Sequence, residues 1–285
     1  MTQVPVIKLN NGVEIPQEGF GVYQIPEFEA CKRAVLTALE TGYRLIDTAQ
    51  AYNNEAAVGA AIEESPLDRA DIFITTKVWI SNYGYEQTKA SIKVSLEKLK
   101  TDYIDMVLLH QPFGDYYGAY HALEELYKKG TIRAIGISNF YPDRYIDLVG
   151  FNDVIPAVNQ IETHVFDQRK VDRKYLAENN TKIEVWAPLA EGANGIFTND
   201  LLVTIGNRYH KTPAQIALKF LAEEGVVIIP KSTHPARIKE NFAIWDFNLT
   251  QEELTQIRAL DLGKSLFMDH ESPEAAKQFV QWGKN

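Results

Sequence analysis

Apolar segments of strand length recur along this chain at a nearly constant interval, with amphipathic segments between them. Their carboxyl ends lie near Gly21, Asp47, Lys77, His110, Ser138, Gln160, Trp186 and Pro230. From the second end to the seventh, successive ends are 30, 33, 28, 22 and 26 positions apart, close to the roughly 30 residues of one β-α-β unit. Alternation at this period indicates a parallel sheet, and eight such units close into a barrel. We therefore predict an α/β fold, a (β/α)8 TIM barrel.

Three further segments are expected to lie outside the eight repeating units of the barrel. Short alternating strands on either side of Asn11-Gly12 predict an N-terminal β-hairpin. The longest interval precedes the last strand and predicts an insertion around residues 191–200. Residues from about Gly263 onward form a C-terminal extension. No Pro- or Gly-rich linker divides the sequence, and a single barrel commonly has about 250 residues, so we expect residues 1–285 to be one domain.

Composition limits the partners and the setting of the protein. The formal net charge of −9 at pH 7 disfavours nucleic acid and anionic membranes as main partners. Cys31 is the only cysteine, the N-terminus has no basic-then-apolar leader, and no apolar stretch approaches the roughly 18 residues that span a bilayer. The six histidines show no paired ligand spacing, so no metal site is expected. We expect a cytoplasmic monomer that acts on a small molecule.

Polar side chains end three neighbouring strands of the predicted barrel. Asp47, Lys77 and His110 end the second, third and fourth strands, and Tyr52 lies five positions past Asp47. In such a barrel all strands open on one face, where active sites lie. Asp47 would keep Lys77 charged, and the ammonium is expected to lower the pKa of Tyr52 from its usual value near 10. Tyr52 could then protonate a developing alkoxide while His110 orients the carbonyl.

Each of these residues also has a purely structural interpretation. His110 could be a hydrogen-bonded core residue, Asp47 a helix cap, Lys77 a surface side chain with a buried stem, and Tyr52 a packing residue. Charged groups gathered at one barrel mouth are a stronger functional signal than any single residue. We therefore favour a catalytic set suited to carbonyl reduction, provided that a hydride donor binds beside it.

A dinucleotide site is expected at the end of the barrel rather than in a glycine-rich loop. The segment GFGVYQ (19–24) lacks the third glycine of the Rossmann fingerprint. Barrels bind phosphate after strands seven and eight, where Lys231 follows the last strand, Ser232 could cap a helix and Arg237 lies early in that helix. A 2′-phosphate on Arg237 would favour NADP over NAD. The alternative is an ordinary capped helix with a solvated basic face.

Other strand ends could hold the nicotinamide. Trp186 offers a flat face to the ring, and Ser138, Asn139 and Gln160 could bind its carboxamide. Each of the four could equally satisfy local backbone groups, and the sequence leaves both interpretations open.

Four segments, in the correct order, resemble the signatures of the aldo-keto reductase family, and most closely those of the bacterial 2,5-diketo-D-gluconate reductase-like branch. They are GYRLIDTAQAYNNE (42–55), ITTKVW (74–79), IDMVLLHQP (104–112) and IPKSTHPARIKEN (229–241). The resemblance runs from the hairpin to about Leu262. It implies NADPH-dependent reduction of aldehydes, ketones or dicarbonyls, with the cofactor extended across the barrel mouth.

The resemblance also implies a role for each site residue. The catalytic residues would be Asp47, Tyr52, Lys77 and His110, with Tyr52 as proton donor. The substrate would contact Tyr23, Tyr52, Trp79, His110 and the C-terminal tail. The cofactor would contact Gly21, Val22, Tyr23, Ser138, Asn139, Gln160, Trp186, Pro188, Leu189, Lys231, Ser232, Arg237, Glu240 and Asn241.

The sequence departs from the family pattern at three positions, and two other functions stay open. Ala187 stands where serine is usual, Val22 replaces a residue expected beside the ribose, and His234 is unusual near the 2′-phosphate. A Schiff-base lyase would use Lys77 as nucleophile, although a neighbouring Asp47 would keep that amine protonated. A non-catalytic, nucleotide-binding regulatory subunit of the same fold is the other alternative.

Overall fold

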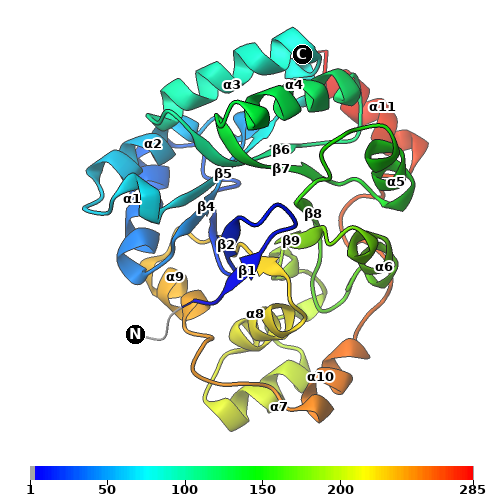
Figure 1. The fold of residues 1–285 in the computed structure, drawn as a ribbon. Coiled ribbons are helices and arrows are strands. Elements are labelled where there is room, and N and C mark those ends of the chain that lie inside the picture. The colour runs from blue at the N-terminus through cyan, green and yellow to red at the C-terminus, as the bar shows by residue number, and fades with distance from the viewer. Residues whose placement is uncertain (1–3, 285) are drawn as a thin grey trace.

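A computed structural model describes residues 4–284 of the chain (Figure 1). A parallel sheet with the order β10-β9-β8-β7-β6-β5-β4-β3 forms its centre. The strands are β3 (Phe20–Gly21), β4 (Leu45–Asp47), β5 (Phe73–Val78), β6 (Ile104–Leu109), β7 (Ile132–Ser138), β8 (Val158–Glu162), β9 (Lys182–Trp186) and β10 (Val227–Ile228). The amide of Gly19 donates to the carbonyl of Ile228 (2.8 Å), and the amide of Ile228 donates to the carbonyl of Gln17 (2.9 Å). These bonds join the two ends of the sheet and close the predicted barrel.

Helices surround the barrel (Figure 1). They are α1 (Phe28–Thr41), α2 (Glu55–Glu64), α3 (Tyr85–Leu99), α4 (Tyr116–Lys128), α5 (Pro142–Gly150), α6 (Lys170–Glu178), α7 (Asp200–Tyr209), α8 (Pro213–Glu223), α9 (Pro235–Phe242), α10 (Gln251–Arg258) and α11 (Pro273–Trp282). In α1, Ala34, Val35, Ala38 and Leu39 are buried, which is the spacing that lays one apolar stripe on the core. Within residues 4–284, no helix combines the length and the apolar character needed to cross a membrane.

Several predicted boundaries are confirmed. The sequence TPAQIALKFL predicts a helix with Thr212 as its cap and Pro213 at its first position, and in the structure Thr212 caps α8 with a complete capping box and Pro213 is the first helical residue. Gly130, before TIRAIGIS, predicts the end of a helix; it follows α4 with a φ of 77°, a conformation that glycine adopts without steric cost. The predicted insertion contains the short 3-10 helix η4 (Ala190–Gly195), where several residues have left-handed backbone angles.

Three boundaries were predicted wrongly. The sixth barrel strand, β8, continues past Gln160 to Glu162, because Ile161 and Glu162 still pair with β9. The last strand ends at Ile228 rather than at Pro230. Ser232 does not cap the following helix, because α9 begins only at Pro235 and His234 is its cap. Proline suits the first helical position because its fixed φ matches the helix and its missing N–H is not needed there.

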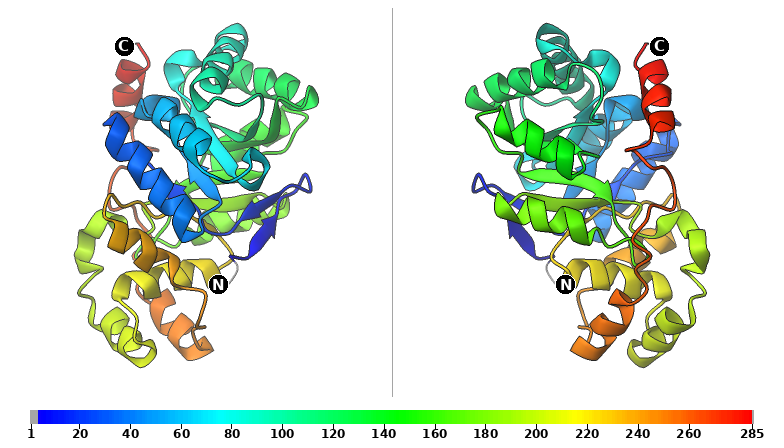
Figure 2. Two further views of the ribbon diagram at one scale, coloured as in Figure 1. Left: turned by 90° about the vertical axis from the view of Figure 1, so that its left-hand side faces the viewer. Right: turned by 90° about the vertical axis from the view of Figure 1, so that its right-hand side faces the viewer.

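The predicted hairpin lies across the amino-terminal end of the barrel. Strands β1 (Val6–Lys8) and β2 (Glu14–Pro16) pair in antiparallel register. Leu9 and Ile15 are buried against Leu45, Phe73 and Met106 inside the barrel. Figure 2 shows the hairpin and the C-terminal segment on opposite sides of the molecule. One end of the barrel is therefore plugged, and the site must be at the other end.

Candidate active site

Lys77 is the centre of a buried polar cluster at the carboxyl ends of the strands. Asp47 ends β4, and Lys77 lies one residue before the end of β5. The fully buried ammonium of Lys77 donates to Asp47 Oδ1 at 2.5 Å and to the carbonyl of Thr48 at 2.9 Å. It also lies 3.3 Å from the hydroxyl of Tyr52. Tyr52 is carried there by the 3-10 helix η1 (Gln50–Tyr52), which directly follows β4.

His110 joins this cluster from the neighbouring strand. It follows β6 directly, and its amide donates to the carbonyl of Val78 at 3.1 Å. Its ring lies edge-on to Tyr52, with centroids 5.6 Å apart, and to Trp79, at 5.1 Å. The ring of Tyr23 lies 5.0 Å from that of Tyr52. The structure therefore brings together the four residues predicted to be catalytic and surrounds them with the aromatic residues predicted to bind substrate.

The ion pair keeps Lys77 charged. Burial has the largest single effect and acts to lower the pKa of Lys77, but Asp47, with smaller contributions from Tyr52 and Glu184, outweighs it, and the pKa lies above its ordinary value of 10.5. A fully buried cation needs such a partner, because an unpaired charge in the interior is strongly unfavourable. Lys77 is therefore a permanent positive charge next to Tyr52.

The predicted direction of the Tyr52 pKa shift was wrong. Burial of the phenol raises its pKa to about 12; Lys77 lowers it, but this offsets only part of the effect of burial, and Asp47 acts in the same direction as burial. The hydroxyl therefore stays protonated at neutral pH. This state suits an acid that gives up its proton only when negative charge develops on a neighbouring atom, with Lys77 placed to stabilise the resulting phenolate.

His110 is a neutral imidazole in this environment. Burial, followed by the charge of Lys77 and by His270, holds the pKa of His110 well below 6.5. Its Nδ1 atom has no hydrogen-bond partner among the described residues. A neutral imidazole has one N–H donor and one acceptor, so His110 can donate one hydrogen bond to a carbonyl oxygen without adding a second cation beside Lys77.

Glu184 is a buried residue of the site that the sequence analysis missed. The side-chain amide of Gln160 donates to Asp47 Oδ2 (2.9 Å) and to Glu184 Oε1 (3.1 Å). Burial raises the pKa of Glu184 to about 8, and the charge of Asp47 adds to this effect. The sequence did contain a signal for Glu184. It lies two positions before Trp186 in an apolar strand, and because side chains alternate along a strand, both residues point to the same face.

The residues predicted to hold nicotinamide form one connected group. The indole N–H of Trp186 donates to Asn139 Oδ1 at 2.9 Å. The amide of Asn139 donates to Ser138 Oγ (3.1 Å) and to the carbonyl of His110 (3.3 Å). Trp186 is half-buried, so part of its ring surface faces the mouth. A flat ring beside fixed amide groups fits a planar carboxamide ligand.

The other predicted cofactor residues differ in their exposure. Lys231 and Arg237 are exposed near the amino end of α9, an arrangement that fits a phosphate. Ser232 is buried, and its Oγ accepts a hydrogen bond from the amide of His234 at 3.1 Å. Of the remaining predicted cofactor residues, Gly21, Val22, Pro188 and Asn241 are buried, and Leu189 and Glu240 are half-buried.

Comparison with known proteins identifies the family of this site. A model of the aldo/keto reductase family matches residues 19–262. The chain belongs to the aldo/keto reductase family. This reductase is 41% identical over 272 residues to methylglyoxal reductase DkgA of Escherichia coli (strain K12), covering 94% of this chain and 98% of the relative. It is 42% identical over 256 residues to glyoxal reductase of Bacillus subtilis (strain 168), covering 90% and 92%.

A solved structure of the same family has the same architecture. The aldo-keto reductase of Bombyx mori in complex with NADP has a TM-score of 0.87 at 29% identity, covering 95% of this reductase and 97% of that chain. The predictions of the family, its bacterial branch, the barrel fold and an oxidoreductase are confirmed by these matches. The roles of individual residues and the extent of one domain stay predictions.

Proposed function

We propose that this aldo/keto reductase uses NADPH to reduce aldehyde and ketone carbonyls to alcohols, with Tyr52 as the proton donor. The observation that carries the proposal is the position of the Lys77 ammonium, 2.5 Å from Asp47 and 3.3 Å from the Tyr52 hydroxyl. NADPH, when bound, supplies the hydride for the carbonyl carbon. Tyr52 protonates the carbonyl oxygen, and Lys77 stabilises the phenolate that remains. His110 donates a hydrogen bond that orients the same oxygen.

The same proposal assigns the cofactor contacts. Trp186 stacks on the nicotinamide, and Asn139 and Ser138 bind its carboxamide. Lys231 and Arg237 bind the 2′-phosphate, since two cations near a helix amino end favour a dianion. NADP is the cofactor that the Bombyx mori relative carries, which supports this assignment.

The substrates proposed are small carbonyl compounds, including α-dicarbonyls. The names of two relatives, methylglyoxal reductase and glyoxal reductase, describe this class. Tyr23, Tyr52 and Trp79 give the mouth an aromatic lining that suits a compact substrate with one polar end. The monomeric state and the cytoplasmic setting stay predictions.

The pairing of Lys77 with Asp47 argues against a Schiff-base lyase. A lysine nucleophile must lose its proton, whereas Asp47 raises the pKa of Lys77 above its ordinary value. A regulatory subunit without activity would bind NADPH tightly but would not oxidise it with any carbonyl compound.

One panel experiment separates the three functions. NADPH oxidation is followed with aldehydes, α-dicarbonyls and keto-sugars, and parallel samples are treated with borohydride and examined by mass spectrometry. Turnover without a substrate adduct on Lys77 is the expected result. Covalent labelling of Lys77 would establish the lyase, and tight NADPH binding without any oxidation would establish the regulatory subunit.

A further inference from the structure

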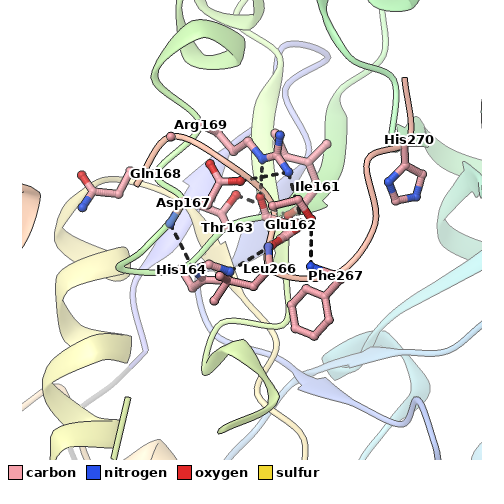
Figure 3. A network of polar contacts seen from close by, with 12 residues as sticks. Ile161, Glu162, Thr163, His164, Asp167, Gln168, Arg169, Leu266, Phe267 and His270 are labelled. Carbon is pink, nitrogen blue, oxygen red and sulfur yellow. Dashed lines mark hydrogen bonds and ion pairs between the residues drawn. The ribbon is translucent and has the colours of Figure 1, made fainter. Parts of the chain in front are cut away.

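The segment between α10 and α11 lies beside the barrel mouth without regular secondary structure of its own. Its Phe267 ring lies 5.5 Å from the ring of Trp186, and the ring of His270 lies 6.3 Å from the same indole. Leu266 and Met268 pack against the hydrophobic core. Figure 3 shows this segment crossing in front of β8. The amide of Leu262 donates to the carbonyl of Phe166 at 2.8 Å. Because the residues that follow have no strand or helix to fix them, the position of residues 265–270 depends mainly on their side-chain contacts.

One carboxylate makes two of these contacts. Glu162 is the last residue of β8 and is fully buried. Its Oε2 atom accepts from the hydroxyl of Ser265 at 2.5 Å, and its Oε1 atom accepts from the amide of Leu266 at 2.9 Å. The hydroxyl of Ser265 in turn accepts from the amide of Phe267 at 3.0 Å. Three consecutive tail residues are thus tied to the end of one barrel strand (Figure 3).

The barrel holds Glu162 in place independently of the tail. Two backbone amides donate to His164 Nδ1, so the ring proton is on Nε2, which donates to Glu162 Oε1 at 3.0 Å. Arg169 donates to the Glu162 carbonyl at 2.8 Å and forms an ion pair with Oε2 at 3.3 Å. Burial acts to raise the pKa of Glu162, but the hydrogen bonds from His164, Ser265 and the Leu266 amide, together with the charge of Arg169, outweigh it and keep the pKa below 4.5. The tail therefore meets a fixed anion, and hydrogen bonds to an ion are among the stronger ones.

We propose that Glu162 is a positioning residue, whose contacts with residues 265–267 fix the tail beside Trp186 and thereby set which substrates the mouth accepts. This inference rests on the proposed reductase function. A substrate with an aromatic group beyond its carbonyl contacts the tail, so its binding depends on where the tail lies. A compact dicarbonyl contacts only Tyr52, Trp79 and His110, so its binding does not depend on the tail.

Two variants and one matched control test the proposal. Ser265→Ala removes one tail contact and leaves the charges of Glu162 and Arg169 unchanged, whereas Glu162→Gln removes the anion. Ser65→Ala is the control, because Ser65 Oγ also accepts an amide two positions later, from Leu67 at 3.3 Å, in a segment remote from the tail. Tail anchoring is measured by the rate of tryptic cleavage after the exposed Lys264. Substrate choice is measured by KM and kcat for methylglyoxal and for 4-nitrobenzaldehyde.

The expected result is faster cleavage after Lys264 in both variants, with the larger effect in Glu162→Gln. The KM for 4-nitrobenzaldehyde rises about tenfold in Glu162→Gln, the effect of losing a hydrogen bond to a charged group. The KM and kcat for methylglyoxal stay within about twofold of the wild type in both variants. In Ser65→Ala, the cleavage rate and the KM and kcat for both aldehydes also stay within about twofold.

Two results would overturn the inference. Unchanged cleavage in both variants would show that Glu162 does not anchor the tail. Equal losses with both aldehydes, or no change with either, would show that the anchor does not select substrates. Failure of the proposed function is distinguishable, because the wild type would then turn over neither aldehyde while the cleavage rates still report on the anchor.

Discussion

At the scale of single residues, the site depends on one buried ammonium. Lys77 contacts Asp47, the carbonyl of Thr48 and the hydroxyl of Tyr52 at the same time. Asp47 keeps this ammonium charged despite burial. The charge is useful to catalysis only when Tyr52 has lost its proton, so its effect is specific to the transition state.

Asp47→Asn is therefore expected to make activity sensitive to alkaline pH. Burial acts to lower the pKa of Lys77, and without the carboxylate the ammonium loses its proton at a lower pH than in the wild type. We predict that the alkaline limb of the kcat/KM profile moves to lower pH, so that the loss relative to the wild type is greater at pH 9 than at pH 6. A profile parallel to that of the wild type would contradict the assigned role of Asp47.

Glu184 is expected to make the fold less stable as the pH rises. Its pKa is raised from 4.5 to about 8 in the folded protein, so folding favours the protonated form. This contribution to stability is complete below about pH 4.5 and is lost as the pH rises through about 8. The free energy of unfolding in urea should fall less between pH 5 and pH 9 in Glu184→Gln than in the wild type, by a few kcal/mol. Equal falls in the two proteins would contradict the burial of an ionisable carboxyl there.

Residue identities were easier to predict than residue environments. The four residues at the mouth were predicted because strand ends converge in a barrel, whatever the details of packing. The pKa of Tyr52 was predicted in the wrong direction because its burial comes from neighbours far away in sequence. Glu184 was missed because its partner, Gln160, lies on another strand, 24 positions earlier.

At the scale of elements, the interval between apolar segments correctly predicted the alternation of strands and helices along the chain. Local signals are sufficient where the cause is local, as in the capping box of Thr212 and the turn at Gly130. Local signals fail where pairing with another strand determines the end of a strand. Strand β8 continues to Glu162 because its last residues pair with β9. The helix after the last strand was predicted too early, since Ser232 binds the amide of His234 as a cap residue would.

Thr212 connects α8 to α9, the helix proposed to bind the cofactor phosphate. Its hydroxyl caps α8 and also donates to Glu240 Oε1 on α9 at 2.8 Å. Thr212→Ala should lower the free energy of unfolding by about 1 kcal/mol and also weaken NADPH binding, because α9 carries Arg237. Thr250 forms the same capping box on α10, so Thr250→Ala should cost similar stability and leave NADPH affinity unchanged. Equal NADPH affinities in the two variants would contradict the link to α9.

At the scale of the whole molecule, the closed barrel separates stability from chemistry. The hairpin plugs the amino-terminal end, and the polar cluster of Lys77 lies at the carboxyl-terminal end. The fold class could be predicted because a strand interval near 30 residues admits few other architectures. The position of the C-terminal tail could not, because its contacts with Glu162 have no local sequence signal.

A substitution in the buried face of the N-terminal hairpin should therefore affect stability and leave activity unchanged. Ile15 is fully buried, and Ile15→Ala should lower the free energy of unfolding by about 2–5 kcal/mol through loss of burial and the cavity that remains. The kcat/KM of the folded enzyme should stay within about twofold of the wild type. Val6→Ala, at a position that is 55% exposed on the same hairpin, is the control and should change stability by less than about 0.5 kcal/mol. A large fall in kcat/KM for Ile15→Ala would show that the two ends are coupled.

The most direct test of the account is the turnover of Tyr52→Phe. This substitution keeps the ring that packs on Tyr23 and His110 and removes only the hydroxyl that lies 3.3 Å from the Lys77 ammonium. We predict that kcat with methylglyoxal falls by about 100- to 10,000-fold, the usual contribution of a general acid, while the Kd for NADPH changes by less than about twofold. A variant that keeps a tenth or more of the wild-type turnover would show that Tyr52 is not the proton donor.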